Sequence, residues 1–298
     1  MKWCNFISID ICSALLFIPV LLLTVKLRLF WIDWLAMLEW IIFALIGVVA
    51  GLFSGLLGLG GGLIIVPTLL AVFSWQALPE SQLMHMAVGT SLMTITVTSL
   101  SSMYAHHQHK NINWDVVRRL SPGLIIGAIL GAGLATLLSS TLLQQVFAIY
   151  VFVIAVRMWL PMLPSGDTYL LNKSILIVFS IIAGTFSALV GIGGGSLVVP
   201  YLVMAKQSIY RAIGSSVACG FPISVAAVIG FMIFGQNQDV SDKAWQTGFI
   251  QWKAFLGIIS TSTLFSIWGA KLAKHLPVTI LKRIFSLVLL CVVISLFV

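Results

Sequence analysis

Gly51-Leu-Phe-Ser-Gly-Leu-Leu-Gly-Leu-Gly-Gly-Gly-Leu-Ile-Ile-Val-Pro-Thr-Leu-Leu70 returns 133 positions later as Gly184-Thr-Phe-Ser-Ala-Leu-Val-Gly-Ile-Gly-Gly-Gly-Ser-Leu-Val-Val-Pro-Tyr-Leu-Val203, with 11 of 20 residues identical. Both copies lie in apolar surroundings, and in both a run of glycines interrupts the hydrophobic pattern. Glycine-interrupted hydrophobic segments at matching places in two halves of a chain mark the binding site in many secondary transporters. The duplicated stretch therefore predicts both the architecture and the place of a site.

The composition is that of a membrane protein. Of the 298 residues, 60% are hydrophobic and 8% are charged, whereas soluble domains carry roughly 25% charged residues. The mean hydropathy is +1.12. Many apolar runs approach the length of about 20 residues that a membrane helix needs, and no run alternates as a barrel strand would. We therefore expect an all-α polytopic membrane protein without a soluble domain.

The apolar runs define the expected helices. They span 4–25, 36–57, 62–75, 84–105, 120–138, 141–160, 174–190, 196–205, 212–234, 250–270 and 279–298. Segments 62–75 and 196–205 are short, which indicates half-helices or the second arm of a tight hairpin. Segment 4–25 is expected to be a retained extra N-terminal helix rather than a signal peptide, because no Ala-x-Ala cleavage site precedes Lys26.

The repeat extends beyond the glycines. Residues 87–91 (Ala-Val-Gly-Thr-Ser) match residues 212–216 (Ala-Ile-Gly-Ser-Ser), and a later match joins 131–135 to 269–273. Each half thus contains a glycine-broken helical hairpin followed by three helices. We predict three parts: the N-terminal helix and loop at 1–33, the first repeat at 34–165 and the second repeat at 166–298.

Loop charges indicate the direction of each half. If each glycine-broken pair enters and leaves on one side of the membrane, 12 of the 16 basic residues face the cytoplasm. If each pair crosses once, the best split of these 16 residues is 9 against 7. The positive-inside rule favours the first arrangement. Each half then has an odd number of crossings, which predicts two inverted-topology repeats, a cytoplasmic N-terminus and a periplasmic C-terminus.

The glycine breaks suit an anion. A helix that starts after such a break presents unpaired N–H groups, and its N-terminus carries a partial positive charge. Inverted repeats would aim two such ends at one small, oxygen-rich group, with nearby hydroxyls as further donors. The predicted binding residues are Gly60, Gly61, Gly62, Gly193, Gly194, Gly195, Ser196, Thr90, Ser91, Ser215 and Ser216.

Two structural explanations stay open. Small residues four apart let membrane helices pack closely, so the glycines can serve packing alone. Small hydroxyl residues in membrane helices often bond the backbone, so Thr90, Ser91, Ser215 and Ser216 can be structural too.

The sequence gives little support for a proton relay, a metal site, an enzyme active site or nucleic-acid binding. No carboxylate lies deep in the repeated core, so an acidic proton relay lacks a carrier. His106, His107 and His109 are expected in a solvated basic loop rather than at a metal. The four cysteines have no ligand spacing and are expected to be inert. No nucleophile–base pair is visible, and we expect no enzyme, no cofactor and no metal. The net charge of +8 is scattered over short loops, which argues against nucleic acid.

Three motifs resemble a known family. The doubled Gly-x-Gly-Gly-Gly-x-x-x-x-Pro, the Ala-x-Gly-Thr-Ser at 87–91, and the stretch His106-His-Gln-His-Lys-Asn-Ile-Asn-Trp114 are similar to the sulfite exporter TauE/SafE family, also called TSUP. The resemblance covers about residues 36–298. It implies a bacterial inner-membrane permease for sulfur-containing anions such as sulfite or organosulfonates. Because the second half reads Gly214-Ser-Ser where the first reads Gly89-Thr-Ser, the two half-sites are not expected to be equivalent.

The membrane potential suggests the direction of transport. It favours the exit of an anion by about 2.3 kcal/mol per charge per 100 mV. We therefore expect facilitated or weakly coupled export by alternating access, for which a coupling proton or sodium ion is an optional partner. One alternative is an importer of sulfate, thiosulfate or an organosulfonate, coupled to a proton or a sodium ion. A second is a membrane scaffold that transports nothing. The expected partners are the anion and the lipid bilayer, and a homo-oligomer is compatible with the sequence.

Overall fold

The computed structural model describes residues 37–58, 60–76, 78–159, 172–236, 245–272 and 278–297. The chain divides into two compact units, Met1–Ile42 and Phe43–Val298. Every contact discussed below lies within the second unit. The predicted N-terminal helix over 4–25 lies outside the described residues.

The described residues from 37 to 159 form a series of helices. Their bounds are Met37–Leu57, α2 Gly62–Trp75, α3 Leu83–Gln108, α4 Trp114–Leu137 and α5 Ser140–Trp159. The glycine break thus lies between one long helix, Met37–Leu57, and one short helix, α2. Three long helices follow.

The same order of elements occurs again after residue 172. The bounds are α6 Lys173–Val190, α7 Gly195–Met204, α8 Ile209–Phe234, α9 Trp252–Leu272 and α10 Val278–Phe297. Two short antiparallel strands, β1 Gln246–Thr247 and β2 Ile250–Gln251, stand just before α9. They were not predicted, because two residues per strand are too few for an alternating pattern to show.

Six helices of the described residues are long and apolar enough to cross a membrane: Met37–Leu57, α3, α4, α5, α8 and α9. The fold is that of an all-α polytopic membrane protein, as predicted. Helices α2 and α7 have 14 and 10 residues, so they are about 21 and 15 Å long. Both are shorter than the hydrocarbon layer of about 30 Å, as the short apolar runs predicted.

Three boundaries differ from the prediction by three residues or more: the start of α4, the end of α3 and the start of α8, which is Ile209 rather than 212. Helix α4 starts at Trp114 rather than at 120, because the Asn113 side chain accepts a hydrogen bond from the N–H of Val116 and Asp115 lies in the first turn. Helix α3 runs to Gln108, so the prediction that His106 lies in a solvated loop is wrong. His106 is 3% exposed and its Nε2 lies 3.3 Å from the carbonyl oxygen of Gly55.

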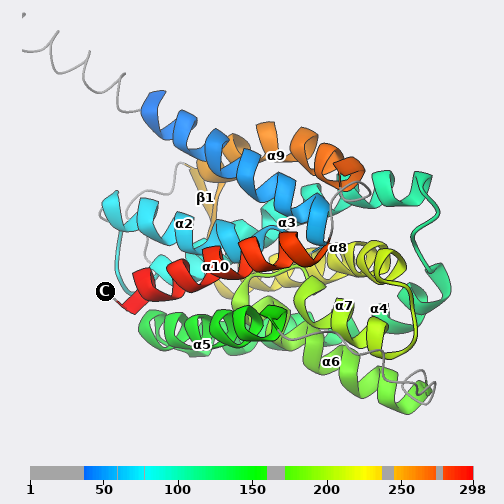
Figure 1. The fold of residues 1–298 in the computed structure, drawn as a ribbon. Coiled ribbons are helices and arrows are strands. Elements are labelled where there is room, and N and C mark those ends of the chain that lie inside the picture. Colours follow the sequence, from blue (N-terminus) through cyan, green and yellow to red (C-terminus); the bar gives the residue numbers. More distant parts are fainter. Residues whose placement is uncertain are drawn as a thin grey trace, which may run out of the picture. The chain divides into compact units, whose positions relative to one another are not determined.

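Helices α3 and α8 form the centre of the second unit. They are the two most buried of the six candidate spans, and they pack against each other. Helix α4 packs against α6 and α8, and α9 packs against α3. Helices α5 and α10, which end the two halves, lie side by side (Figure 1).

Glycines make two close helix seams. A Cβ on Gly127 or Gly131 of α4 would collide with a backbone carbonyl of α6. A Cβ on Gly51 or Gly55 would likewise collide with a backbone carbonyl of α9. The helix Met37–Leu57 therefore lies as close to α9 as α6 lies to α4, and each seam joins a helix of one half to a helix of the other.

Candidate functional site

Each half has a glycine break between its first helix and its short second helix. Gly58 and Gly191, which follow the first helix, have φ angles of 70° and 74°. Gly61 and Gly194 are the N-cap residues of α2 and α7, with φ angles of 75° and 77°. Left-handed backbone costs a residue with a side chain roughly 1–2 kcal/mol. These four positions therefore favour glycine for backbone reasons alone.

The two breaks lie against each other. A Cβ on Gly60 would stand 3.1 Å from both Cα and N of Gly193, and one on Gly62 would collide with the carbonyl oxygen of Gly191. The six glycines predicted for the site are all buried: Gly60, Gly61, Gly62, Gly193, Gly194 and Gly195. The two glycine runs are thus brought together with backbone in contact with backbone.

Two buried serines hold these breaks in a reciprocal way. The Ser91 hydroxyl in α3 donates to the carbonyl oxygen of Gly191 at 2.9 Å. The Ser216 hydroxyl in α8 donates to the carbonyl oxygen of Gly58 at 3.3 Å. Each central helix therefore fixes the glycine break of the opposite half.

The two neighbouring hydroxyls also form a matched pair. The N–H of Gln251, the residue before α9, donates to Thr90 Oγ1 at 3.0 Å. The N–H of Asn113, the residue before α4, donates to Ser215 Oγ at 2.9 Å. Both hydroxyl side chains are fully buried. Ser91 and Ser216 thus contact the breaks, and Thr90 and Ser215 hold the residues before α9 and α4. Each of the four already makes a hydrogen bond with protein backbone.

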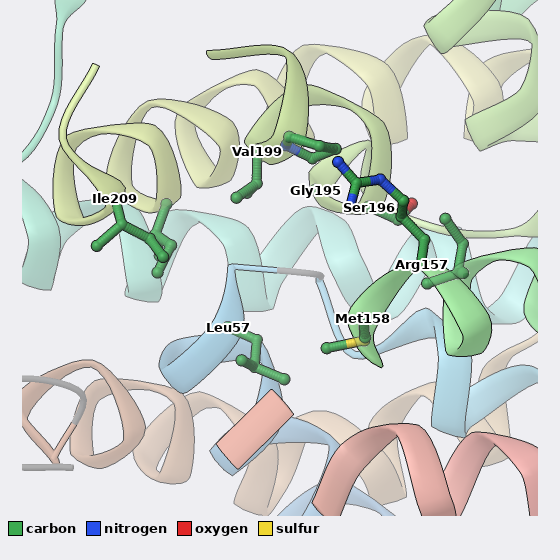
Figure 2. A pocket seen from close by; sticks show the side chains of 10 residues that line it. Leu57, Arg157, Met158, Gly195, Ser196, Val199 and Ile209 are labelled. Atoms are coloured by element: carbon green, nitrogen blue, oxygen red, sulfur yellow. The ribbon is translucent and has the colours of Figure 1, made fainter. Parts of the chain in front are cut away.

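A cavity of about 40 Å³ opens at the first turn of α7, which gives room for about three water molecules. Gly195 and Ser196 line it, together with Leu57 and Met158 (Figure 2). The first amides of a helix have no partner inside the helix. In α7 the hydrogen bonds to the N-cap carbonyl start at Leu197. The earlier N–H groups, those of Gly195 and Ser196, are left for a ligand or for water.

The Ser196 hydroxyl has a phenol as its neighbour. Ser196 is 5% exposed, and its Oγ lies 2.5 Å from the hydroxyl oxygen of Tyr150 in α5. Either oxygen can be the donor in this pair. One hydroxyl donates its proton to the hydrogen bond between these two oxygens. The other hydroxyl can then donate a hydrogen bond to a group bound in the cavity.

Arg157, near the end of α5, brings a positive charge to the same cavity. Figure 2 shows its side chain reaching from α5 toward Gly195 and Ser196. Its guanidinium makes no ion pair with any residue that the structure describes, and none of the described lining residues is acidic. A guanidinium beside a helix N-terminus makes this cavity electropositive.

The positions that correspond to these residues in the other copy of the repeat lack the same polar groups. With the repeat spacing of 133 residues, the position that corresponds to Ser196 is Leu63. The spacing of 138 residues between α5 and α10 places Val288 opposite Tyr150 and Ser295 opposite Arg157. The polar cavity, which Ser196 of the second half forms together with Tyr150 and Arg157 of the first, therefore has no polar counterpart at the repeat-related place.

Several residues were missed by sequence reasoning. Ser54 and Ser187, which lie three residues before the end of the first helix of each half, have buried hydroxyls with no hydrogen-bond partner among the described residues. A Cβ on Gly194 would stand 3.6 Å from Ser187 Oγ. The repeated Phe-Ser at 53–54 and 186–187 could have revealed them. Arg157 and Tyr150 lie outside the repeated motif, and no local pattern marks them.

His85 also has a structural place. Its Nε2 lies 3.0 Å from the carbonyl oxygen of Ala135 and 3.1 Å from that of Leu138, where α4 ends. Its ring stacks on Phe249 with centroids 5.0 Å apart. Among the described residues no three His, Cys, Asp or Glu side chains gather as a metal site would require.

Known proteins resemble the chain along most of its length. Residues 43–296 match the family described as "Sulfite exporter TauE/SafE". A "Probable membrane transporter protein" of Haemophilus influenzae is 36% identical over 257 residues, which cover 85% of this chain and 96% of the relative. A "Probable membrane transporter protein YunE" of Bacillus subtilis is 25% identical over 275 residues, which cover 86% of this chain and 96% of that relative. The comparison with solved structures finds no match. The chain is an integral membrane protein, a membrane transporter that belongs to the sulfite exporter TauE/SafE family.

Proposed function

We propose that this transporter exports a small sulfur oxyanion, of the sulfite or organosulfonate type, and binds it at the first turn of α7. The cavity beside Ser196 carries the proposal. It combines free helix amides, the Ser196–Tyr150 hydroxyl pair and the Arg157 guanidinium. All three are donors that favour an oxygen-rich negative group.

The size of the cavity supports a small substrate. Its volume of about 40 Å³ suits a group of a few atoms, such as the head of a sulfite or sulfonate. The lining is otherwise apolar, with Leu57, Val199 and Ile213 among it. An anion held there gains from low local polarity, because charge-assisted hydrogen bonds are stronger away from water.

The remaining predicted residues then have two kinds of role. Gly195 supplies a free amide, and Gly194 lets α7 start at the required angle. Gly60, Gly61, Gly62 and Gly193 allow the two breaks to touch. Thr90, Ser91, Ser215 and Ser216 hold those breaks and the starts of α4 and α9 through their backbone hydrogen bonds. Ser187, whose buried hydroxyl has no partner among the described residues, is a further donor near the break.

We infer that the two halves are inverted repeats. Ser91 bonds Gly191 while Ser216 bonds Gly58, and such reciprocity is what a two-fold axis between the halves produces. Loop charges favour an axis in the membrane plane. Alternating access would then expose the α7 cavity first to the cytoplasm and then to the periplasm, across a bacterial inner membrane.

Flux measurements in vesicles test the proposal. Purified protein is reconstituted, the vesicles are loaded with labelled sulfite, and a potassium diffusion potential is imposed. Efflux should accelerate when the interior is negative, because a monoanion gains about 2.3 kcal/mol per 100 mV on leaving. The variant Arg157→Gln should slow efflux by roughly ten-fold or more, since a hydrogen bond to a charged group contributes about 1.5–3 kcal/mol.

The matched control is Arg283→Gln, which removes one exposed arginine from α10 and should leave efflux unchanged. If the Arg157→Gln variant shows full efflux, the substrate site lies elsewhere in the protein, and the proposal of export is not contradicted. Uptake that needs a proton or sodium gradient would replace export with coupled import. No flux in either direction would favour a scaffold, for which the contact between Gly60 and Gly193 already offers a packing role.

A further inference from the structure

A second hollow lies on the outside of the α4–α6 pair. It is lined by Arg118, Arg119, Pro122, Leu176 and Ile177, and its volume is about 600 Å³. We call it the α4–α6 groove. It is far larger than the cavity at α7, and it shares none of that cavity's described lining residues.

Two cations without an ion-pair partner among the described residues line this groove. Arg118 and Arg119 are both exposed. Asp115 stands one turn before them on α4, yet no ion pair joins these residues in the part of the chain that the structure describes. Two adjacent guanidinium groups without a counter-ion repel each other, and a bound phosphate would relieve that repulsion by accepting paired hydrogen bonds.

The depth of the arginines suits a lipid headgroup. Helix α4 has 24 residues and is about 36 Å long, against a hydrocarbon layer of about 30 Å. Arg118 and Arg119 stand about 6 to 8 Å from its first residue along the axis. The guanidinium groups therefore lie near one membrane surface, while the helix continues into the hydrocarbon.

The walls below the arginines are apolar and face outward. Six exposed aliphatic side chains continue from the groove along the two helices: Ile125, Ile126, Ile129 and Leu130 on α4, and Val178 and Ile182 on α6. Between the helices Gly123, Gly127 and Gly184 hold the backbones in close contact, so the groove cannot close by movement of one wall against the other. Acyl chains can lie along this fixed surface.

We propose that the α4–α6 groove binds one anionic phospholipid, with its phosphate between Arg118 and Arg119 and its acyl chains along the exposed aliphatic side chains. Basic pockets between membrane helices at a membrane surface recognise lipid headgroups in this way. A zwitterionic lipid offers the same phosphate, but its own cation lies beside it and weakens the attraction to two arginines.

The transported anion is a poorer occupant. Apart from the two arginines, the described lining is Pro122, Leu176 and Ile177, whose side chains donate no hydrogen bond. A free inorganic anion would keep most of its surface in water there. The apolar walls favour a ligand that has a charged head and hydrocarbon chains together.

Native mass spectrometry of the full chain, purified in mild detergent, tests the proposal. Phosphatidylglycerol and phosphatidylcholine with identical acyl chains are added at matched concentrations. Phosphatidylglycerol should bind more tightly by about ten-fold or more. The variant Arg118→Gln/Arg119→Gln should weaken its binding by about thirty-fold, since each basic residue near a membrane surface contributes about 1 kcal/mol, a factor of about five.

Two further variants keep the test specific. Arg118→Lys/Arg119→Lys retains the charge but not the paired geometry, and should give an intermediate affinity. Lys271→Gln/Arg283→Gln removes two cations elsewhere and should leave phosphatidylglycerol binding unchanged. Thermal unfolding without lipid checks that every variant folds.

Four results would overturn the proposal. One is equal binding of both lipids, and another is unchanged binding after Arg118→Gln/Arg119→Gln. The third is displacement of phosphatidylglycerol by millimolar inorganic phosphate, which would make the groove a site for free anions. The fourth is a dimer that dissociates in the glutamine variant, because the groove would then bind a second copy of the chain instead of a lipid. None of these readouts depends on transport.

Discussion

Gly60 and Gly193 meet more closely than ordinary side-chain contacts allow: a Cβ on Gly60 would lie 3.1 Å from Cα of Gly193. The two residues stand in the glycine breaks of opposite halves, which the sequence separates by more than a hundred residues. Their contact means that neither break can shift without moving the other. The glycine runs are thus a junction between the halves as well as the starts of two short helices.

The N-cap glycines should tolerate alanine poorly. Gly61→Ala and Gly194→Ala should each lower the free energy of unfolding by about 1–2 kcal/mol, because both residues have left-handed backbone. A Cβ at Gly194 would also stand 2.5 Å from Ile223 Cδ1. Thermal unfolding in detergent measures the effect.

Gly133→Ala is the control for these variants, since the nearest atom to its Cβ is 3.6 Å away in the Phe234 ring. It should be neutral or stabilising by up to about 1 kcal/mol, because alanine has the higher helix propensity. Equal stability of all three variants would contradict the strain argument.

The hydroxyls of Thr90 and Ser215 should protect specific amides from exchange. Thr90→Val and Ser215→Ala remove the acceptors for the N–H groups of Gln251 and Asn113. Leaving a buried donor unpaired costs about 1–3 kcal/mol. Hydrogen exchange at these two amides should accelerate accordingly, by roughly five-fold or more. Thr96→Val is the control, because that hydroxyl bonds the carbonyl of Leu92 in its own helix, and its exchange pattern should match the parent protein.

His85 should stabilise the end of α4. His85→Phe keeps a ring against Phe249 but removes the nitrogen that contacts the carbonyls of Ala135 and Leu138. The free energy of unfolding should fall by about 1–3 kcal/mol. His107→Phe, at an exposed position, should change it by less than about 0.5 kcal/mol. If the two variants unfold alike, the contacts of His85 contribute nothing to stability.

The inverted arrangement predicts opposite sides for two loops. In a cysteine-free background, Ser81→Cys before α3 should react with an impermeant reagent from the periplasm, and Ser208→Cys before α8 from the cytoplasm. Both residues are exposed. If one of the cysteines does not react from one side, the membrane rather than the protein therefore keeps the reagent away from it. Reaction of both from the same side would exclude inverted halves.

The helices could be predicted because their signals are local. Apolar runs of membrane length and the glycine breaks gave boundaries within a few residues from 36 onward, apart from the starts of α4 and α8 and the end of α3. Helix α4 begins earlier than its hydropathy suggests because Asn113 caps it, and His106 is buried where its ring nitrogen lies beside the carbonyl oxygen of Gly55. Such effects depend on partners distant in the sequence.

The candidate site was predicted in part. Ser196 and Gly195 follow from the repeated motif, and the structure adds a cavity beside them. Arg157 could not be recognised, since an arginine near a helix end is also what the positive-inside rule produces at any cytoplasmic loop. Tyr150 lies in the middle of an apolar run, where only its contact with Ser196 distinguishes it from a packing residue.

The seam between α4 and α6, and its counterpart between Met37–Leu57 and α9, each join a helix of one half to a helix of the other. A rigid body that keeps either seam intact therefore contains helices of both sequence copies and coincides with neither copy. A gene cut at its middle would encode two fragments, and neither fragment could form either seam until it met the other in the membrane.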